Sequence, residues 1–275
     1  MIIINYENIE NSIHKIGRKV NSIIGEVLRD IPFPWLIEPI ARKKMSRYID
    51  EINAWNEYTN YIATANISYE LEAFLGLNIS LCSSASRGNS HYRNLDWPIK
   101  RLKKWEVFKY INGPCGEFKT VGVPGLIGCL TGCAKKRFSI SINADMECNA
   151  HLSGTPVALL IRQALEECKN YKNAVDFMAE HLPMRSSFVH IVSPSGQSSV
   201  VHMKRKSEVL KIREITNHHP DYEYFYDEEL YEESLERLEM LQKSYRNIWE
   251  FPVYSDQTMQ CVVMNSKTGE IKRGD

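Results

Sequence analysis

The hydrophobic pattern of this chain changes its period near Ile79, and this change restricts the folds that the chain can adopt. Before it, apolar residues recur every three or four positions over 9–28 and again over 37–55, which predicts two amphipathic helices. After it, short apolar runs separated by turn residues predict strands. In 138–143 apolar and polar residues alternate, so we expect one apolar and one polar face. Helices ahead of a mostly β body predict an α+β fold of packed layers.

The β-rich part contains further helices among its strands. The expected strands lie around Cys82 and at 91–97, 105–110, 118–123, 126–131, 138–143, 188–192, 199–203, 209–215 and 259–264, with a short last strand after a turn at 266–269. The expected helices lie at 156–168, 174–181 and 227–245. The chain has no internal period, so its segments predict layers rather than repeats.

The composition is typical of a soluble globular protein, with 43% hydrophobic and 25% charged residues in 275. Basic and acidic residues both number 34, so no net charge attracts nucleic acid, and we expect none to bind. No apolar run approaches the ~18 residues of a membrane span. The N-terminal apolar run is too short and too acidic for a signal peptide, which favours a cytoplasmic location, or a lysosomal or secreted one if a leader was trimmed.

The seven cysteines are odd in number and irregularly spaced, which predicts free, mostly buried thiols. Cys129 and Cys133 have no second ligand pair at a zinc-type spacing, so neither a metal nor another cofactor is expected. His218 and His219 are interpreted as solvated loop histidines, because no carboxylate or third ligand has a matching spacing.

Cys82 is the candidate nucleophile, because it ends a strand beside the small polar residues Ser83 and Ser84. A thiol needs a base to become a nucleophile, and no histidine is obviously placed to serve. If the Leu81–Cys82 bond were cut, the new α-amine, with a pKa near ~8, would lie beside a thiol with a pKa near ~8.5. One residue would then supply both nucleophile and base. The alternative is a buried structural thiol.

Several short motifs resemble one known family in the same order along the chain. They are Cys82-Ser-Ser, then 91–97 (HYRNLDW), 121–132 (VGVPGLIGCLTG), 138–143 (FSISIN), 158–162 (ALLIR) and 216–218 (TNH), with 66–71 (NISYEL) ahead of them. Together they resemble the choloylglycine hydrolase superfamily of N-terminal-nucleophile hydrolases, and more closely its acid ceramidase and N-acylethanolamine acid amidase branch. The likeness covers most of 45–275.

The resemblance implies a fold and a division of the chain. It implies an αββα sandwich, in which two antiparallel sheets lie between helical layers. It also divides the chain into a helical N-terminal segment, 1–81, as a propeptide or α subunit, and a catalytic body, 82–275.

The resemblance also assigns roles to site residues, which are Cys82, Arg93, Asp96, Asn143, Asn217 and Arg237. It implies that Arg93 lies near the thiolate and that Asp96 binds the amine. The oxyanion hole would use the backbone at Asn143 and the amide of Asn217. Arg237 matches a further family element.

The same residues can also be interpreted without the family resemblance. Since Arg93 and Asp96 are three apart on one strand, they are expected on opposite faces unless the strand bulges. Taken alone, Asn217 is a turn or cap residue, and Arg237 a surface arginine that pairs with Glu233 or Glu236.

The chain departs from the family pattern in two places. The interval from Cys82 to Arg93 is several residues shorter, which implies a tighter hairpin. Asn143-Ala144-Asp145 replaces the family's Asn-Glu-Arg, so the glutamate linked to acid-dependent activation is missing at its own position, with Asp145 as a candidate substitute.

We therefore expect an amidase that cleaves itself at Leu81–Cys82 and hydrolyses a linear, non-peptide C–N amide of an N-acylated lipid or amine through a thioester. Two alternatives stay open: an acyltransferase to an amine acceptor, and a non-catalytic acyl-chain-binding homologue. The expected partner is a small, lipid-like N-acyl amide. Peripheral membrane contact through the N-terminal helices is a minority interpretation, because their polar faces mix both charge signs. The sequence leaves the oligomeric state open.

Overall fold

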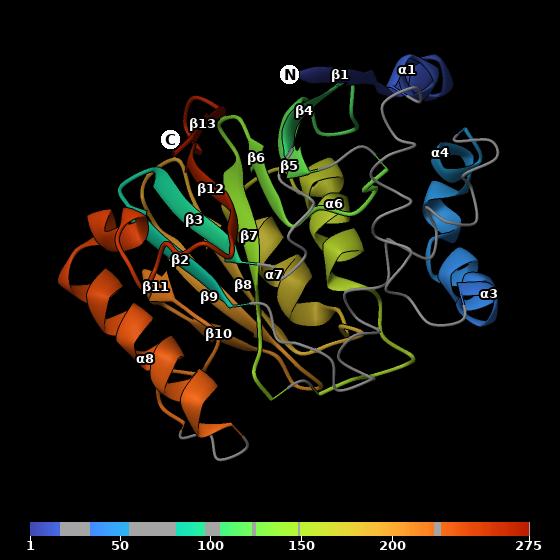
Figure 1. The fold of residues 1–275 in the computed structure, drawn as a ribbon. Coiled ribbons are helices and arrows are strands. Elements are labelled where there is room, and N and C mark those ends of the chain that lie inside the picture. Colours follow the sequence, from blue (N-terminus) through green and yellow to red (C-terminus); the bar gives the residue numbers. More distant parts are fainter. Residues whose placement is uncertain are drawn as a thin grey trace.

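The computed structural model describes residues 1–16, 34–54, 81–96, 105–122, 125–147, 149–222 and 227–274. Within them, two β-sheets pack face to face, and helices cover the outer face of each sheet (Figure 1). This arrangement confirms the predicted α+β class with an αββα layering. None of the helices in these ranges is long and apolar enough to span a membrane.

The larger sheet has eight strands in the order β1-β4-β5-β6-β7-β8-β9-β10. Their bounds are β1 Ile2–Asn5, β4 Glu106–Ile111, β5 Phe118–Gly122, β6 Thr131–Ala134, β7 Phe138–Ala144, β8 Ser187–Val192, β9 Ser198–Met203 and β10 Glu208–Leu210. All neighbours pair antiparallel except β1 and β4, which are parallel. The first strand of the chain therefore lies at the edge of this sheet.

The smaller sheet has five strands in the order β11-β2-β3-β12-β13. Their bounds are β11 Glu214–Ile215, β2 Cys82–Arg87, β3 Ser90–Asp96, β12 Thr258–Asn265 and β13 Glu270–Arg273. A two-residue loop joins β2 to β3, and Gly88 at its first position has φ +54°, a conformation that glycine adopts without strain. This tight hairpin accounts for the short interval between Cys82 and Arg93.

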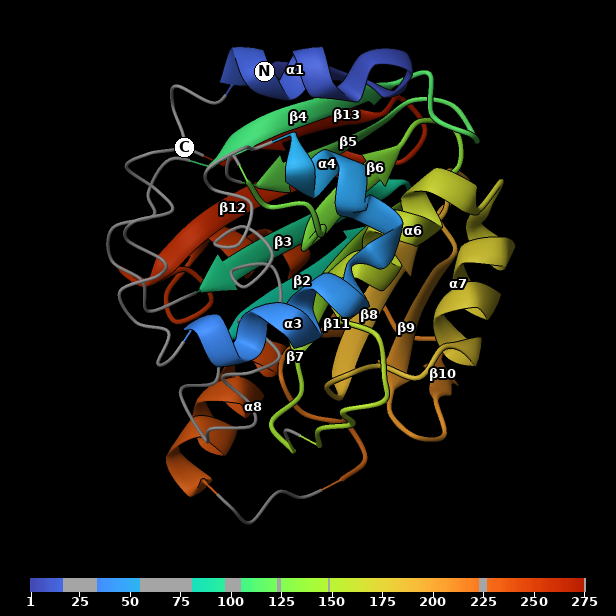
Figure 2. The same ribbon diagram turned by 90° about the vertical axis from the view of Figure 1, so that its right-hand side faces the viewer.

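Different helices cover the two outer faces. The larger sheet is covered by α6 (Val157–Glu167) and α7 (Tyr171–Glu180), whose apolar residues pack against those of β7, β8 and β9 (Figure 1). The smaller sheet is covered by α8 (Glu228–Lys243) and the 3-10 helix η6 (Tyr245–Trp249), which enclose a separate apolar cluster around Ala85. Figure 2 shows the same layers from the side of α3.

The polar face of β7 points between the sheets instead of toward water. Ser139 and Ser141 both bond to the His91 ring on β3, at 3.2 and 3.0 Å. The other face, with Ile140 and Ile142, joins the core under α6. The predicted alternation is confirmed, but both of its faces are buried.

Two expected strands differ from what the structure contains. The run 209–215 is divided between β10 and β11, so this stretch leaves the larger sheet and enters the smaller one. The prediction of a strand at 126–131 was wrong except at Thr131, where β6 begins. Gly125 has φ +91°, and the Cys129 N–H donates to the Ala158 carbonyl at 2.8 Å instead of to a neighbouring strand.

The described part of the N-terminal segment contains several short helices. Their bounds are η1 Tyr6–Asn8, α1 Ile9–Ile16, α3 Pro34–Lys44, η4 Ser46–Tyr48 and α4 Ile49–Asn53. The expected helix at 37–55 is thus interrupted at Met45. Positions 17–28, 55, 97 and 123 of the expected elements, and the motif at 66–71, lie outside the described residues.

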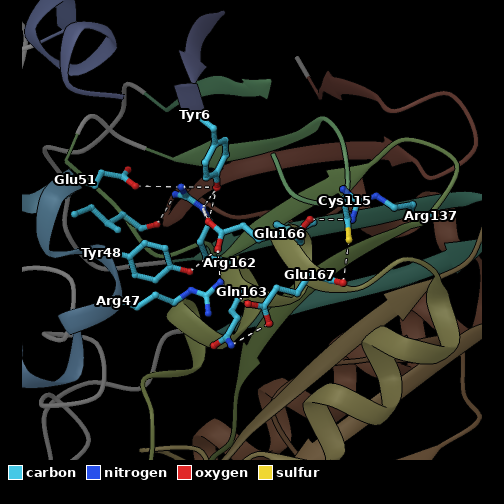
Figure 3. Close-up of polar contacts among 12 residues, drawn as sticks. Tyr6, Arg47, Tyr48, Glu51, Cys115, Arg137, Arg162, Gln163, Glu166 and Glu167 are labelled. Carbon is cyan, nitrogen blue, oxygen red and sulfur yellow. Dashed lines mark hydrogen bonds and ion pairs between the residues drawn. The ribbon is translucent and has the colours of Figure 1, made fainter. Parts of the chain in front are cut away.

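A buried arginine links the N-terminal helices to α6 (Figure 3). Arg162 pairs with Glu51 at 3.1 Å and with Glu166 at 2.7 Å, and all three side chains are almost fully buried. Tyr48 donates to Glu166 at 3.0 Å, and the Tyr6 hydroxyl also bonds to Glu166. One charged cluster therefore holds η1, η4 and α4 against the body of the protein.

Candidate active site

Cys82 is the first residue of β2, whereas its sequence pattern predicts a place at the end of a strand. It pairs with Leu95 on β3, and its side chain faces the space between the two sheets, 2% exposed. Ser84, two residues on, lies on the same face and pairs with Arg93. The thiol therefore lies at the first residue of a strand, between the two sheets.

The peptide bond between Leu81 and Cys82 is held on both sides. The Asp96 N–H donates to the Leu81 carbonyl at 3.0 Å. The Cys82 N–H donates to Oδ1 of Asn217 at 2.7 Å. Hydrogen bonds at a carbonyl oxygen and at the neighbouring nitrogen fix the plane of this one peptide group.

Arg93 lies directly beside the sulfur. Its Nη2 is 3.4 Å from the Cys82 Sγ, and its Nη1 donates to the Asn94 carbonyl. The guanidinium is completely buried, so its charge acts on the sulfur with little screening by water. The structure thus brings the predicted arginine and thiol together.

Asp96 points to the other face of β3, toward α8. Its Oδ2 accepts from Arg237 Nη2 at 2.5 Å, and both side chains are about 1–2% exposed. Burial raises the pKa of the Asp96 carboxyl above its ordinary value, and the Arg237 guanidinium opposes that rise. The carboxylate therefore contacts Arg237, while the link from Asp96 to the Leu81–Cys82 bond runs through its main chain. Arg237 also pairs with Glu233 at 3.4 Å, but it is not a surface residue.

Asn143 ties together three chain segments at the start of β2. Its Nδ2 lies 3.2 Å from the Cys82 carbonyl, 3.1 Å from that of Ile215 and 3.0 Å from that of Thr216. Since all three are main-chain oxygens, the amide side chain fixes the spacing between β2 and the end of β11. The oxyanion role of the Asn143 backbone stays a prediction.

Asn217 uses both ends of its side-chain amide. Oδ1 accepts from the Cys82 N–H, and Nδ2 donates to the Ala144 carbonyl at 2.8 Å. Its main-chain N–H donates to Ser234 Oγ at 3.1 Å, so α8 positions the loop that carries it. In this arrangement Asn217 orients the Cys82 nitrogen, and a role as oxyanion donor remains a prediction.

A buried histidine pair lies next to this site and was not predicted. The rings of His91 and His190 are 4.5 Å apart, and His190 bonds to Ser84 at 2.9 Å and to Ser198 at 2.8 Å. Burial, together with the nearby Arg93 charge, lowers the pKa of His190 to about 3, and burial lowers the pKa of His91 well below its ordinary value. Both rings are therefore neutral near pH 7. In the sequence, His190 shares its strand face with the apolar residues Phe188 and Val192, so the alternation gave no sign of a polar site there.

Cys82 has Arg93, Asn143 and Asn217 as its polar partners in the described part of the chain. A histidine base is not among these contacts. Six of the seven cysteines are described, and all six are free thiols. Burial raises the pKa of Cys129 and of Cys133 to about 12, which makes these two thiols unreactive.

Two histidines that their spacing predicts to be solvated are buried. His218 and His219 are each 1% exposed, so that interpretation was wrong. His218 bonds to Ser234 at 2.8 Å, and His219 lies 3.5 Å from the Glu208 carboxylate. The spacing argument missed this carboxylate because it lies on a different strand, β10. Asp145, the candidate substitute for the missing glutamate, accepts from the His202 ring at 2.7 Å.

A small cavity of about 110 Å³ opens beside β12. Trp105, Val121, Gln260 and Val262 are among its lining residues. Gln260 pairs with Leu95, which in turn pairs with Cys82, so the cavity lies along the same cross-strand row as the thiol.

Two sheets between helical layers, with a thiol at the first residue of an inner strand, define the fold class of N-terminal-nucleophile hydrolases. The family model described as acyl-coenzyme A:6-aminopenicillanic acid acyl-transferase matches residues 85–250, which is more than half of the chain. The chain belongs to this family. The matched region begins just after Cys82, so the match by itself does not identify the nucleophile.

A solved structure of another protein agrees with the fold. The Caenorhabditis elegans N-acylethanolamine-hydrolyzing acid amidase (NAAA) ortholog superposes with a TM-score of 0.55 at 19% identity, over 67% of this chain and 92% of that one. A mutant of conjugated bile acid hydrolase from Clostridium perfringens gives a TM-score of 0.38 at 13% identity, over 51% of this chain and 54% of that one. Among curated proteins, no sequence matches this chain. Family and fold together indicate an enzyme of amide-bond chemistry, either an amidase or an acyltransferase.

Proposed function

We propose that this protein cleaves its own Leu81–Cys82 bond and then uses Cys82 as an N-terminal nucleophile to hydrolyse the linear C–N amide of an N-acylated lipid or amine. The observation that supports this proposal is the set of contacts around that one peptide bond. The Asp96 N–H donates to its carbonyl, Asn217 holds its nitrogen, and Arg93 places a positive charge beside the adjacent sulfur.

Self-cleavage begins with attack of the Cys82 sulfur on the Leu81 carbonyl carbon. The carbon–sulfur bond forms, negative charge develops on the carbonyl oxygen, and the Asp96 N–H stabilises that charge. The C–N bond then breaks, and the thiol proton ends on the Cys82 nitrogen. Water hydrolyses the resulting thioester and leaves a Leu81 carboxylate and a free Cys82 thiol.

Turnover reuses the same groups on a substrate amide. The freed α-amine takes the thiol proton and passes it to the leaving amine, and the sulfur forms a thioester with the acyl group. Water activated by the same α-amine then releases the acid. Arg93 stabilises the thiolate, and Asn217 Oδ1 orients the α-amine through the contact that it already makes with this nitrogen.

The family match favours a second outcome for the same thioester. In an acyltransferase, an amine instead of water attacks the thioester carbonyl, and an N-acyl product forms. Both reactions share every step up to the thioester, so the residues around Cys82 serve either one. Adding an amine acceptor to the assay distinguishes them, because a transferase forms acyl amide where a hydrolase releases only the acid.

Intact-mass spectrometry tests the proposal directly. Wild-type protein should yield a fragment that begins at Cys82, together with activity on a fluorogenic N-acyl aminocoumarin. Cys82→Ala should abolish both, because it removes the group that both steps need. Cys133→Ala, which removes a buried thiol of another strand, is the matched control and should retain both.

Two results would contradict the proposal. One is an intact chain that still turns over N-acyl amides, because the nucleophile would then lack a free α-amine. The other is a chain that stays intact and binds acyl chains without turnover, as expected for the non-catalytic homologue.

A further inference from the structure

Two histidines and a glutamate from three different segments meet at one point between the sheets. His202 lies on β9, Glu208 on β10, and His219 follows β11. Each offers one nitrogen or oxygen, and these atoms all lie within 4.8 Å of one another. His219 Nε2 and Glu208 Oε2 are 3.5 Å apart. Both histidines are almost completely buried, and Glu208 is partly exposed.

The strand register explains this meeting. His202 pairs directly with Glu208 across β9 and β10, and on its other side with Phe188 of β8, so these side chains share one face of the sheet. Phe188 pairs in turn with Asn143. The chain leaves β10 in the larger sheet for β11 in the smaller one, and His219 lies four residues after the end of β11.

Asp145 fixes the ring of His202. Its Oδ2 accepts from His202 Nε2 at 2.7 Å, which assigns the ring proton to that nitrogen. The other nitrogen, Nδ1, is buried and has no hydrogen-bond partner among the described residues. A carboxylate that orients one ring nitrogen while the other carries a lone pair is the usual outer arrangement of a metal-ligating histidine.

We propose that these residues bind a divalent transition-metal ion of the zinc type. His202 Nδ1, His219 Nε2 and one Glu208 oxygen are the three protein ligands, and a water completes a tetrahedral set. Nitrogen and carboxylate donors in this ratio suit zinc better than calcium or magnesium, which prefer oxygen ligands.

Existing contacts of His219 and Glu208 must change when the ion binds. His219 Nδ1 accepts from the main-chain N–H of Asp221 at 3.2 Å. When Nε2 binds the ion, the ring proton must move from Nε2 to Nδ1. The Asp221 N–H must then donate to water, to which Asp221 is exposed. Lys204 lies 3.9 Å from Glu208 Oε2 and must withdraw from the carboxylate.

The ion would link the loop that carries Asn217 to the end of β7, which Asn217 contacts. Asp145 directly follows Ala144, whose carbonyl accepts from Asn217, and His219 comes two residues after Asn217. Binding would therefore stabilise the loop that positions the Cys82 nitrogen, at a distance from the thiol. This inference does not depend on the proposed amidase activity, because its readouts are binding and stability.

The test uses the full-length Cys82→Ala chain after treatment with a chelator. Zn²⁺ should bind with one ion per chain and raise the melting temperature by several degrees. Co²⁺ should give the visible absorption of a tetrahedral nitrogen and oxygen site, without a thiolate band. His219→Gln and Glu208→Gln should each weaken binding by at least about tenfold. His181→Gln, which changes a half-exposed histidine at the end of α7, is the matched control and should bind like the parent.

Glu208→Gln is the decisive variant because Glu208 is on the surface side of the site, so its replacement should leave the fold intact. Co²⁺ spectra that are the same in Glu208→Gln and His219→Gln as in the parent would overturn the proposal. So would the lack of any stoichiometric binding by the parent chain.

Discussion

The side-chain amide of Asn217 makes a hydrogen bond at each end, so replacing this residue removes both bonds. Oδ1 holds the Cys82 nitrogen, and Nδ2 holds the Ala144 carbonyl. Its side chain is fully buried, so water cannot replace either bond. At the scale of single residues, the site thus depends on a few amides and charges with fixed partners.

Asn217→Ala should reduce kcat by about 100- to 1,000-fold with a nearly unchanged KM, if the amide also meets the developing oxyanion. It should also lower the free energy of unfolding by about 1–3 kcal/mol, because two buried partners lose their bonds. Asn247→Ala is the control, because Asn247 donates to the Met240 carbonyl at 2.7 Å in η6 and should change stability alone. Wild-type kcat and self-cleavage in Asn217→Ala would exclude a catalytic role.

Asp96 and Arg237 should behave as one unit. Asp96→Asn leaves the buried Arg237 charge without its closest partner, so we expect a loss of about 3–5 kcal/mol in the free energy of unfolding. Replacing both, with Arg237→Met added, should recover most of that loss. Urea unfolding of the two single variants and the double variant measures the coupling. Additive losses would show that the pair is not coupled. As a control, Glu117→Gln in the half-exposed Lys109–Glu117 pair should lower the free energy of unfolding much less.

At the scale of elements, the described part of the N-terminal segment packs onto the same body as the strands that carry the candidate site. β1 extends the larger sheet, and the Arg162 cluster fastens η1, η4 and α4 to α6. Arg162 also stacks on the Tyr110 ring, 4.1 Å from its centroid. If the chain is cut at Leu81–Cys82, these contacts lie on both sides of the cut and would keep the two pieces together.

Arg162→Met should loosen this junction. It leaves Glu51 and Glu166 buried without their shared cation, so we expect a loss of about 3–5 kcal/mol in unfolding free energy. Arg47→Gln, in a salt bridge to Glu167 on the same junction, should cost less than about 1 kcal/mol because Arg47 is 43% exposed. Size-exclusion chromatography of cleaved protein should show the N-terminal piece leaving only in Arg162→Met. Equal retention and equal stability of both variants would contradict this function of the cluster.

At the scale of the whole molecule, buried neutral histidines should make the protein sensitive to acid. Burial lowers the pKa of His190 to about 3 and that of His218 to about 4. In the unfolded chain a histidine takes up a proton below about pH 6.5. The unfolded state then binds more protons than the native one, so stability falls as the pH drops from about 6.5 toward these lower values.

Replacing one such histidine should reduce that slope. Between about pH 6.5 and 3, His190→Gln should remove about 1.4 kcal/mol per pH unit from the acid-induced loss of stability. The comparison with wild type cancels the opposite effect of Glu51 and Asp96, whose pKa values burial raises. Chemical unfolding at several pH values measures both slopes. Parallel pH profiles for the two proteins would mean that His190 takes up its proton as readily in the folded state as in the unfolded one, and would contradict this prediction.

The order of helices and strands could be read from the sequence because hydrophobic periodicity is a local property. The hairpin of β2 and β3, the alternation in β7 and the helices α6, α7 and α8 all follow from residues within about a dozen positions of one another. The run 209–215 shows the limit of that reasoning. Its apolar residues predict a strand, but only the packing of two sheets decides that the strand is shared between them.

The contacts of the site depended on the tertiary structure. The nitrogen of Cys82 meets Asn217 across 135 positions, and Asp96 meets Arg237 across 141. Motif order singled out these residues but did not pair Asp96 with Arg237, and spacing alone predicted that His218 and His219 are solvated. Periodicity reports which face of an element is apolar, whereas hydrogen bonds between distant buried groups follow from strand register and sheet packing. The sequence therefore determined the layers and the candidate residues, and the fold decided which of their polar atoms meet.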